Sequence, residues 1–491
     1  MASIVGTTGR DFIHAPGIGP GPGDFTDILA TNSGDIINTG GGSDFVRAGA
    51  GDDIIKGAGG DDILSGGAGK DHFFGGEGFD TVLYDTSAEG VLATIGGTGG
   101  FGDAQGDVIE LDIEALVGSR FGDVLVGAGG DDTLKGAGGS DILAGGDGID
   151  LLQGGADNDT LQGGAGGDKL DGGDGNDTIQ YSGPVGVTVN LFTLETANGE
   201  AAGDSIVAVE NVWGTDAGDR LTGSADGNVL RGFGGADDLV GLAGNDRLEG
   251  GDQNDDLTGG AGGDTLIGGN GTDEVHYGGT VGVIVDLIHG TGRQGEAQGD
   301  VLIGIEDVAA TAGDDVVTGS EASNRLLGNS GSDILIGLGG GDTLDGGSND
   351  DQLLGAEGDD ILVGGVGGDR LVGGAGADRL TGGIDADRFV YAAVGDSMFG
   401  AATADRITDF SHAQGDRIDL SAIDADITVA GNQAFHFIGP SQFTGHAGEL
   451  HVLVSSATSV TIEGDVNGDA VADLYIELDG LLFFEAADFV L

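Results

Sequence analysis

Aspartates recur every nine residues over most of this chain, in the pattern Gly-Gly-x-Gly-x-Asp-x-apolar-x. In the first run these residues are Asp35, Asp44, Asp53, Asp62, Asp71 and Asp80. Calcium in proteins takes about six to eight oxygen ligands, from carboxylates and backbone carbonyls. Glycine-rich turns can direct carbonyls toward an ion because glycine lacks Cβ and adopts left-handed conformations. The repeat therefore supplies both kinds of oxygen and predicts calcium binding.

Three further runs keep the same register. The second holds Asp123, Asp132, Asp141, Asp150, Asp159, Asp168 and Asp177. The third holds Asp219, Asp237, Asp246, Asp255, Asp264 and Asp273, with Asn228 in one register position. The fourth holds Asp315, Asp333, Asp342, Asp351, Asp360, Asp369, Asp378 and Asp387, with Asn324 in one register position. Each position has an apolar residue two places later, which excludes chance and argues against a disordered acidic linker. The two asparagines are interpreted as edges of the calcium ladder, where one carboxylate is missing.

The elements that position these aspartates are short strands between glycine turns. Each Asp ends a turn, and the apolar residue after it points from a strand into the core. The predicted organisation is an N-terminal cap (1–33), four repeat arrays (34–80, 123–177, 219–273 and 315–387), three inserts (81–122, 178–218 and 274–314) and a C-terminal domain (388–491). Within the cap, Gly6, Gly9, Asp11 and Ile13 match one degenerate repeat, and residues 16–23 (PGIGPGPG) are expected to form a loop.

The three inserts repeat one another at intervals of 96 or 97 residues. The recurring positions are Tyr84, Tyr181 and Tyr277; Asp107, Asp204 and Asp300; and Glu114, Glu210 and Glu306. The segments 185–191 and 281–287 alternate as strands do. Each insert is therefore expected to be a small β unit that closes one array and opens the next.

Composition limits the partners of the chain. It carries 84 Asp and Glu against 17 Lys and Arg, for a formal charge of −67, which would repel nucleic acid and anionic membrane surfaces. No cysteine is present, so no disulfide can form. No apolar run approaches the length of a membrane span. No ordinary signal peptide is visible at the N-terminus, so a cytosolic protein and one exported without an N-terminal signal both remain open.

These repeats resemble the RTX family of secreted bacterial calcium-binding proteins. The resemblance implies an all-β fold: a parallel β-roll in which two nonapeptides form one right-handed coil. Asp35, Asp53 and Asp71 would then line one edge, and Asp44, Asp62 and Asp80 the other. Ions would lie between successive turns, roughly one Ca²⁺ per nonapeptide repeat.

The C-terminal domain at 388–491 resembles that of serralysin-type secreted metalloproteases. The similar segments are ADRITDF (404–410), GDRIDLSAI (415–423) and GDVNGDAVADLYIEL (464–478). The final EAADFVL (485–491) resembles an uncleaved signal for type I secretion. This implies secretion by a Gram-negative bacterium, with the type I machinery as a partner and an extracellular or cell-surface location.

A separate calcium loop is one of two interpretations of residues 465–473. Asp465, Asn467, Asp469 and Asp473 have the spacing of a calcium loop, and a polar β-turn is the alternative. The segment is not an EF-hand, because Ala470 and Ile476 stand where that motif needs Gly and Glu.

Metal binding is expected to contribute to the folding free energy. Each coil of two nonapeptides buries only two repeat-derived apolar side chains, which cannot offset the entropy of ordering the chain. We therefore expect a largely disordered metal-free chain that folds in millimolar calcium.

No enzymatic motif stands out. The chain has no His-Glu-x-x-His and no Gly-x-Ser-x-Gly. The leading hypothesis is a non-catalytic extracellular structural protein of a surface layer, adhesin or biofilm matrix that folds, and could self-assemble, on binding calcium. The alternatives are a polysaccharide-acting or carbohydrate-binding secreted protein, and the remnant of an RTX protease without its catalytic domain.

Overall fold

The computed structural model describes residues 3–6, 9, 11–14, 26–398, 403–456, 458–480 and 483–491. The loop predicted at 16–23 lies outside these residues. The chain divides by contacts into two compact units, Met1–Leu239 and Val240–Leu491. The described residues form β-strands and short 3-10 helices with no α-helix, which confirms the predicted all-β class. Within them, no helix has the length and apolar character needed to cross a membrane.

The strands follow the predicted order of arrays and inserts. The N-terminal segment and first array contain β1 (Ser3–Val5), β2 (Asp11–His14), β3 (Thr26–Leu29), β4 (Ile36–Asn38), β5 (Phe45–Ala50), β6 (Ile54–Gly59), β7 (Ile63–Ala68), β8 (His72–Glu77) and β9 (Thr81–Leu83). The first insert and second array contain β10 (Leu92–Thr94), η1 (Gly102–Ala104), β11 (Val108–Ile109), β12 (Ala115–Val117), β13 (Val124–Val126), β14 (Thr133–Gly138), β15 (Ile142–Asp147), β16 (Leu151–Ala156), β17 (Thr160–Ala165), β18 (Lys169–Asp174) and β19 (Thr178–Gln180).

The second insert and third array contain β20 (Thr188–Asn190), β21 (Glu195–Ala197), η2 (Gly199–Ala201), β22 (Ser205–Val207), β23 (Asn211–Trp213), β24 (Arg220–Thr222), β25 (Val229–Gly234), β26 (Asp238–Ala243), β27 (Arg247–Asp252), β28 (Asp256–Ala261), β29 (Thr265–Asn270) and β30 (Glu274–His276). The third insert contains β31 (Ile284–Asp286), β32 (Thr291–Arg293), η3 (Gly295–Ala297), β33 (Val301–Ile303) and β34 (Asp307–Ala309).

The fourth array contains β35 (Val316–Thr318), β36 (Arg325–Leu327), β37 (Ile334–Gly339), β38 (Thr343–Ser348), β39 (Gln352–Glu357), β40 (Ile361–Val366), β41 (Arg370–Ala375) and β42 (Arg379–Ile384). The C-terminal stretch contains β43 (Arg388–Val390), η4 (Val394–Asp396), β44 (Asp405–Ile407), β45 (Arg417–Asp419), β46 (His436–Gly439), β47 (Glu449–Val454), β48 (Ser459–Asp465), β49 (Leu474–Asp479), η5 (Ala486–Asp488) and β50 (Phe489–Val490).

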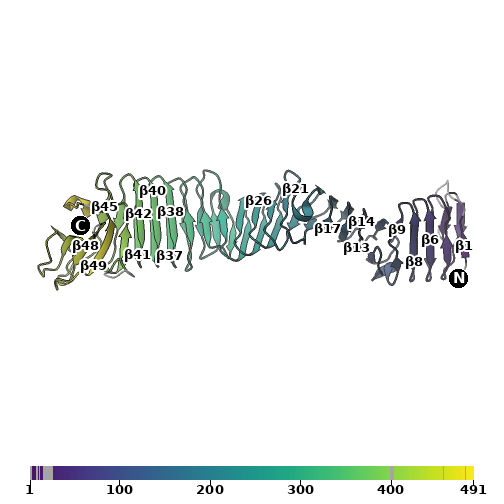
Figure 1. Cartoon of the computed structure of the whole chain (residues 1–491), viewed down its shortest axis with the longest axis horizontal. Helices are drawn as coiled ribbons and strands as arrows, with labels where there is room; N and C mark the ends of the chain where they lie inside the picture. The colour runs from purple at the N-terminus through teal and green to yellow at the C-terminus, as the bar shows by residue number, and fades with distance from the viewer. Residues whose placement is uncertain are drawn as a thin grey trace. The chain divides into compact units, whose positions relative to one another are not determined.

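Within an array, each strand pairs in parallel with the next strand but one. Leu64 of β7 lies opposite Val46 of β5, and Leu371 of β41 lies opposite Leu353 of β39. Successive strands therefore alternate between the two faces of a roll, as Figure 1 shows for the second unit from β37 to β45. This pairing confirms the predicted parallel β-roll.

The core of the roll is a column of apolar side chains from both faces. The residue two places after each register aspartate is fully buried, as in Ile55, Leu64, Phe73, Leu152 and Leu362. These side chains come from the second position of each strand, where the alternation of a strand points them inward. The predicted direction of the apolar residues is confirmed.

Each insert enlarges one coil of the roll and keeps its faces in register. In the first insert β11 pairs with β8, so that Val108 lies opposite His72. On the other strands of this insert, β12 pairs with β9 and β10 pairs with β13, all in parallel. The second and third inserts repeat this scheme and add the antiparallel hairpins β20–β21 and β31–β32. The boundaries of the nine predicted segments stay predictions.

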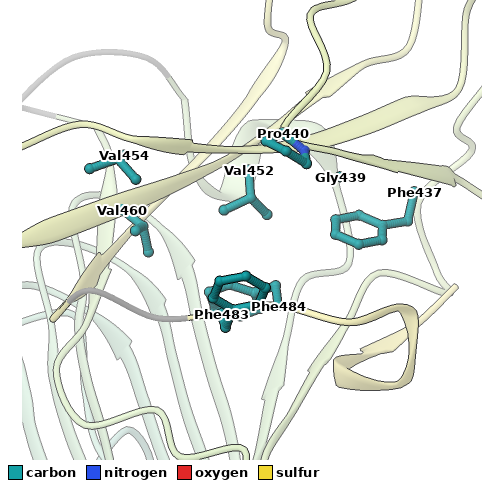
Figure 2. A pocket seen from close by; sticks show the side chains of 8 residues that line it. All are labelled: Phe437, Gly439, Pro440, Val452, Val454, Val460, Phe483 and Phe484. Carbon is teal, nitrogen blue, oxygen red and sulfur yellow. The ribbon is translucent and has the colours of Figure 1, made fainter.

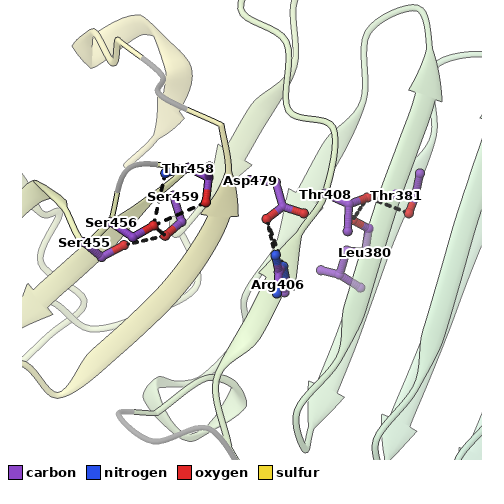
Figure 3. Close-up of polar contacts among 9 residues, drawn as sticks. All are labelled: Leu380, Thr381, Arg406, Thr408, Ser455, Ser456, Thr458, Ser459 and Asp479. Atoms are coloured by element: carbon purple, nitrogen blue, oxygen red, sulfur yellow. Dashed lines mark hydrogen bonds and ion pairs between the residues drawn. The ribbon is translucent and has the colours of Figure 1, made fainter.

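The C-terminal stretch extends both faces of the fourth array. On one face β43 pairs with β45 and β45 with β50; on the other, β44 pairs with β49, which leads into an antiparallel meander of β49, β48 and β47. Figure 3 shows two contacts that join these strands: Thr381 with Thr408, and the ion pair of Arg406 with Asp479. The apolar core of the array therefore continues into this stretch.

Candidate calcium sites

The register aspartates are joined to one another by a repeated hydrogen bond. The amide of Asp53 donates to Oδ1 of Asp71, 2.8 Å away, and the amide of Asp150 donates to Oδ1 of Asp168 at 2.8 Å. Bonds of this kind, 2.6–2.9 Å long, form ladders in both units. Each Asp thus bonds through Oδ1 to the backbone of the coil that precedes it in the chain.

The ladders contain every register aspartate of the four arrays. In the first unit they are Asp35, Asp53 and Asp71; Asp44, Asp62 and Asp80; Asp123, Asp141, Asp159 and Asp177; Asp132, Asp150 and Asp168; and Asp219 with Asp237. In the second unit they are Asp246 with Asp264; Asp255 with Asp273; Asp315, Asp333, Asp351, Asp369 and Asp387; and Asp342, Asp360 and Asp378. The two edges expected for the first array are those that the structure forms.

The second carboxylate oxygen of most of these residues is buried and accepts no hydrogen bond from any described residue. This holds for Oδ2 of Asp53, Asp62, Asp71, Asp80, Asp141, Asp150, Asp159, Asp168, Asp177, Asp264, Asp273, Asp333, Asp342, Asp351, Asp360, Asp369, Asp378 and Asp387. Buried carboxylates without a partner are costly, and they are held in proteins by charge pairing or by metal coordination. The repeat therefore leaves a row of oxygens that need a cation.

Glycine leaves room beside each of these oxygens. A Cβ added to Gly57 would lie 2.3 Å from Oδ2 of Asp62 and 2.6 Å from the carbonyl oxygen of Gly75. The same gap recurs in other repeats: a Cβ on Gly154 would lie 2.2 Å from Oδ2 of Asp159. A carboxylate and a carbonyl therefore converge on a space that only glycine leaves open.

Burial raises the pKa of these carboxyls in the metal-free fold. Loss of solvent is the main cause, and neighbouring aspartates add to it. The pKa of Asp71 rises to about 8, that of Asp141 to about 8 and that of Asp62 to about 7. A group with such a pKa gains from a cation that neutralises it. The oxygen-only donors, their burial and the gap beside them fit calcium, a hard cation that takes carboxylate and carbonyl ligands.

The structure adds carboxylates that the sequence interpretation did not assign to the ladders. In the inserts, Oδ1 of Asp107, Asp204 and Asp300 accepts the amides of Asp71, Asp168 and Asp264. Glu114, Glu210 and Glu306 accept the amides of Asp80, Asp177 and Asp273. In the C-terminal stretch Asp405 and Asp416 accept the amides of Asp378 and Asp387. These insert residues recur in the sequence at intervals of 96 or 97 residues, which marks them as a repeated feature. Their positions in the ladders are set by how the coils stack, which the recurrence does not show.

The two register asparagines occupy ladder positions with their amides bonded. Oδ1 of Asn228 accepts the amide of Ser224, and its Nδ2 donates to the carbonyl of Glu210 at 2.6 Å. Asn324 bonds in the same way to Ser320 and Glu306. A neutral amide therefore replaces a carboxylate at these two positions.

The loop 465–473 bonds mainly to its own amides. Oδ1 of Asp465 accepts the amides of Asn467 and Gly468, and its Oδ2 accepts the amide of Ala470. Asp473 accepts from Val466 and from the side chain of Asn467, and Asp469 accepts the amide of Val471. These contacts are those of a polar turn, and calcium binding by this loop stays a prediction.

Two other features of the described residues differ from the ladders. Asp256, Glu274 and His276 bring one ligand atom each within 4.8 Å of the others, but they are partly exposed and Glu274 also pairs with Arg325. An apolar pocket in the C-terminal stretch is lined by Phe437, Val452 and Phe484 among others (Figure 2). Neither has the repeated buried oxygens of the ladders.

A family comparison decides what the ladders are. The model of the RTX calcium-binding nonapeptide repeat matches residues 29–64, 49–82, 117–152, 145–179, 213–248, 249–280, 302–335, 327–362, 336–371 and 363–398, more than half of the chain. The chain belongs to the RTX calcium-binding repeat family. RTX repeats bind Ca²⁺, and RTX proteins are typically secreted by Gram-negative bacteria.

Several solved structures are similar to parts of this RTX chain. The AlgE6R2 subunit of the Azotobacter vinelandii mannuronan C5-epimerase is 27% identical, with 35% of this chain and 90% of that chain covered and a TM-score of 0.23. The AlgE6R3 subunit of the same enzyme is 28% identical, with 36% and 78% covered and a TM-score of 0.15. The extracellular lipase LipA from Serratia marcescens is 16% identical, with 56% and 40% covered and a TM-score of 0.15. No curated protein sequence matches the chain.

Proposed function

We propose that this RTX protein is a secreted, non-catalytic scaffold that is largely disordered without calcium and becomes a rigid β-roll when calcium binds its ladders. The observation that carries the proposal is the row of buried Oδ2 atoms without hydrogen-bond partners among the described residues. A bound calcium ion neutralises the negative charge of these buried carboxylates. The aspartates themselves hold the coils together through Oδ1, so the same side chains join metal binding to folding.

The cellular role that fits such a scaffold is structural, in a surface layer, adhesin or extracellular matrix. Export in an unfolded state, by type I secretion, agrees with a chain whose charge of −67 opposes folding until calcium is abundant. The serralysin-like C-terminal stretch and its final residues 485–491 are proposed to carry the export signal. Self-assembly on calcium is the proposed route to a surface structure.

A calcium titration followed together by circular dichroism and light scattering tests the scaffold. We expect β signal to appear with calcium, and scattering to rise once the roll has formed if copies assemble. The same β content in excess chelator would contradict calcium-dependent folding. A folded protein whose scattering stays flat at all calcium concentrations would contradict self-assembly alone.

Binding of an acidic polysaccharide is a second candidate, favoured by a row of stacked arginines. Arg370, Arg388 and Arg417 occupy matching register positions on β41, β43 and β45. Neighbouring strands lie about 4.8 Å apart, so the row places three arginines on successive strands, and guanidinium groups bind carboxylates well. Arg388 also pairs with Asp419 at 2.8 Å.

Sedimentation with a polyuronate and with a neutral glucan, both in calcium, tests this candidate. The Arg370→Gln and Arg388→Gln double variant should lose binding to the polyuronate and remain folded. Equal retention on both polymers, or no change in the double variant, would contradict it.

A further inference from the structure

We propose that calcium occupies the interior positions of the ladders, and that a ladder end closed by hydroxyl or amide donors of this chain holds no metal. We call a position interior when Oδ2 accepts no hydrogen bond from the described residues, and capped when Oδ2 of an aspartate, or both side-chain polar atoms of an asparagine, are bonded to the chain. This inference rests on the proposed calcium-dependent folding and concerns which carboxylates take part in it.

The conformation of the residue four places before the Asp separates the two kinds of position. At interior positions this residue is left-handed: Gly67 before Asp71 has φ +87°, and Ala137 before Asp141 has φ +83°. Even Leu338, before Asp342, has φ +83°, although a leucine adopts this conformation only at a cost. No described residue donates to Oδ2 of these aspartates.

In each array, a Ser or Thr lies four residues before the first register aspartate and bonds to its carboxylate. The amide of Ser119 donates to Oδ2 of Asp123 at 2.6 Å, and its hydroxyl donates to Oδ1 at 3.0 Å. The same pair of donors closes the other array starts: Thr31 on Asp35, Thr215 on Asp219 and Thr311 on Asp315. None of these Ser and Thr residues is among the left-handed residues of the described chain.

A buried tyrosine closes the opposite end of two ladders. Oδ1 of Asp107 accepts the amide of Asp71, and its Oδ2 accepts the hydroxyl of Tyr84 at 3.0 Å. Tyr181 closes Asp204 in the same way at 3.0 Å. Tyr84 is 2% exposed. Its hydroxyl lies beside Oδ2 of Asp107, where the proposal places a cation at the interior aspartates.

The chain itself substitutes a neutral side chain only at capped positions. Asn228 and Asn324 are the two register residues that are not aspartate, and each is closed by a serine four places before it, Ser224 and Ser320. An amide cannot supply the negative charge of a calcium ligand, but it can accept and donate the two bonds observed here. Capped positions therefore function without a carboxylate.

It follows that the protein binds fewer ions than it has register positions. The first array illustrates this: Asp35 is capped by Thr31, Asp107 is capped by Tyr84, and Asp53 and Asp71 lie between them with open Oδ2 atoms. In the folded roll these caps satisfy the ladder ends without a metal ion.

Matched Asp→Asn variants of the full chain test the inference, with bound calcium counted by equilibrium dialysis and calorimetry at saturating calcium. The pairs are Asp107→Asn with Asp71→Asn, and Asp123→Asn with Asp141→Asn. We expect each interior variant to lose about one ion per chain or more. Each capped variant should bind as many ions as the wild type, because Asn can replace Asp at a capped position.

The outcomes separate this inference from the proposed function. A capped variant that keeps the wild-type circular dichroism spectrum but loses as many ions as its interior partner would overturn the inference alone. A wild-type protein that binds no calcium would overturn the proposed function. If an interior variant fails to fold, the capped variants still decide: an unchanged ion count supports the inference and a lower count overturns it.

Discussion

The amide of Asp53 donates to Oδ1 of Asp71 at 2.8 Å, while Oδ2 of Asp71 is buried with no hydrogen-bond partner in the described chain. One carboxylate thus has two separate tasks. Its Oδ1 joins two coils of the roll, and its Oδ2 is left for a cation. Because the backbone bond orients the side chain, metal binding at Oδ2 and stacking of the coils stabilise each other.

The space that Gly57 leaves beside Asp62 predicts that one added methyl group strongly lowers stability. In Gly57→Ala the new Cβ would lie 2.3 Å from Oδ2 of Asp62 and 2.6 Å from the carbonyl oxygen of Gly75, so the backbone must shift. We expect a loss of about 1–3 kcal/mol in the free energy of unfolding at saturating calcium. The calcium concentration for half-folding should also rise. Urea unfolding and a calcium titration followed by circular dichroism measure the two effects.

Gly129→Ala is the matched control, because a Cβ there meets nothing within 4 Å. Both substitutions reduce the entropy of the unfolded chain to a similar extent, so their difference isolates the gap. Equal stability of the two variants would contradict a role of the gap in calcium binding.

The raised pKa values predict that metal-free protein is more stable in mild acid. The pKa of Asp71 is about 8 and that of Asp62 about 7 in the fold, against about 4 for Asp in an unfolded chain. Between these values the folded state binds more protons, so stability is full below pH ~4 and falls as pH rises through the folded pKa values. In chelator we expect more β structure near pH 5.5 than at pH 8.

Calcium should compete with these protons. Binding near pH 7 should release protons, and calcium affinity should rise between pH 6 and pH 8. Calorimetry in buffers of different ionisation enthalpy measures the release. Metal-free protein that is more structured at pH 8 than at pH 5.5 would contradict the prediction.

The nine-residue period, with an apolar residue two places after each Asp, predicted short strands with an inward apolar side chain. The coil built from two successive nonapeptides, and with it the ladders, came from the resemblance to RTX repeats. The period places Leu64 on the inner side of a strand, and the resemblance places Asp62 on an edge of the roll. This success depends on repetition, since each coil has the same local environment as the next.

Prediction failed where the repetition stops. Tyr84 and Glu114 recur in the inserts, but they bond to partners 23 and 34 residues away, offsets that the nine-residue period does not give. Asp107 lies 36 residues after Asp71, which is four nonapeptides, but the run of register aspartates stops at Asp80. In the C-terminal stretch, β44 and β45 continue the faces of the fourth array, which the resemblance of that domain did not predict. Such contacts depend on tertiary packing, which the local sequence pattern does not encode.

The tyrosine at the end of the first ladder is expected to stabilise the fold. Tyr84→Phe removes the hydroxyl that bonds Oδ2 of Asp107 and leaves this buried oxygen unpaired. We expect a loss of about 1–3 kcal/mol in the free energy of unfolding. Tyr475→Phe, at a partly exposed side chain of β49, is the control and should cost less. An equal loss in both variants would contradict a special role of Tyr84.

Phe489 in β50 is expected to stabilise the packing of the C-terminal strands. Phe489 of β50 is 6% exposed, and its ring centroid lies 5.1 Å from that of Phe437 and 5.8 Å from that of Phe484. Phe489→Ala should cost about 3–5 kcal/mol, because it removes a buried ring. Phe483→Ala, at a ring that is 95% exposed, is the control and should have little effect. The protease sensitivity of the C-terminal stretch of Phe489→Ala in calcium should increase. Unchanged protease resistance would show that β50 does not hold this end together.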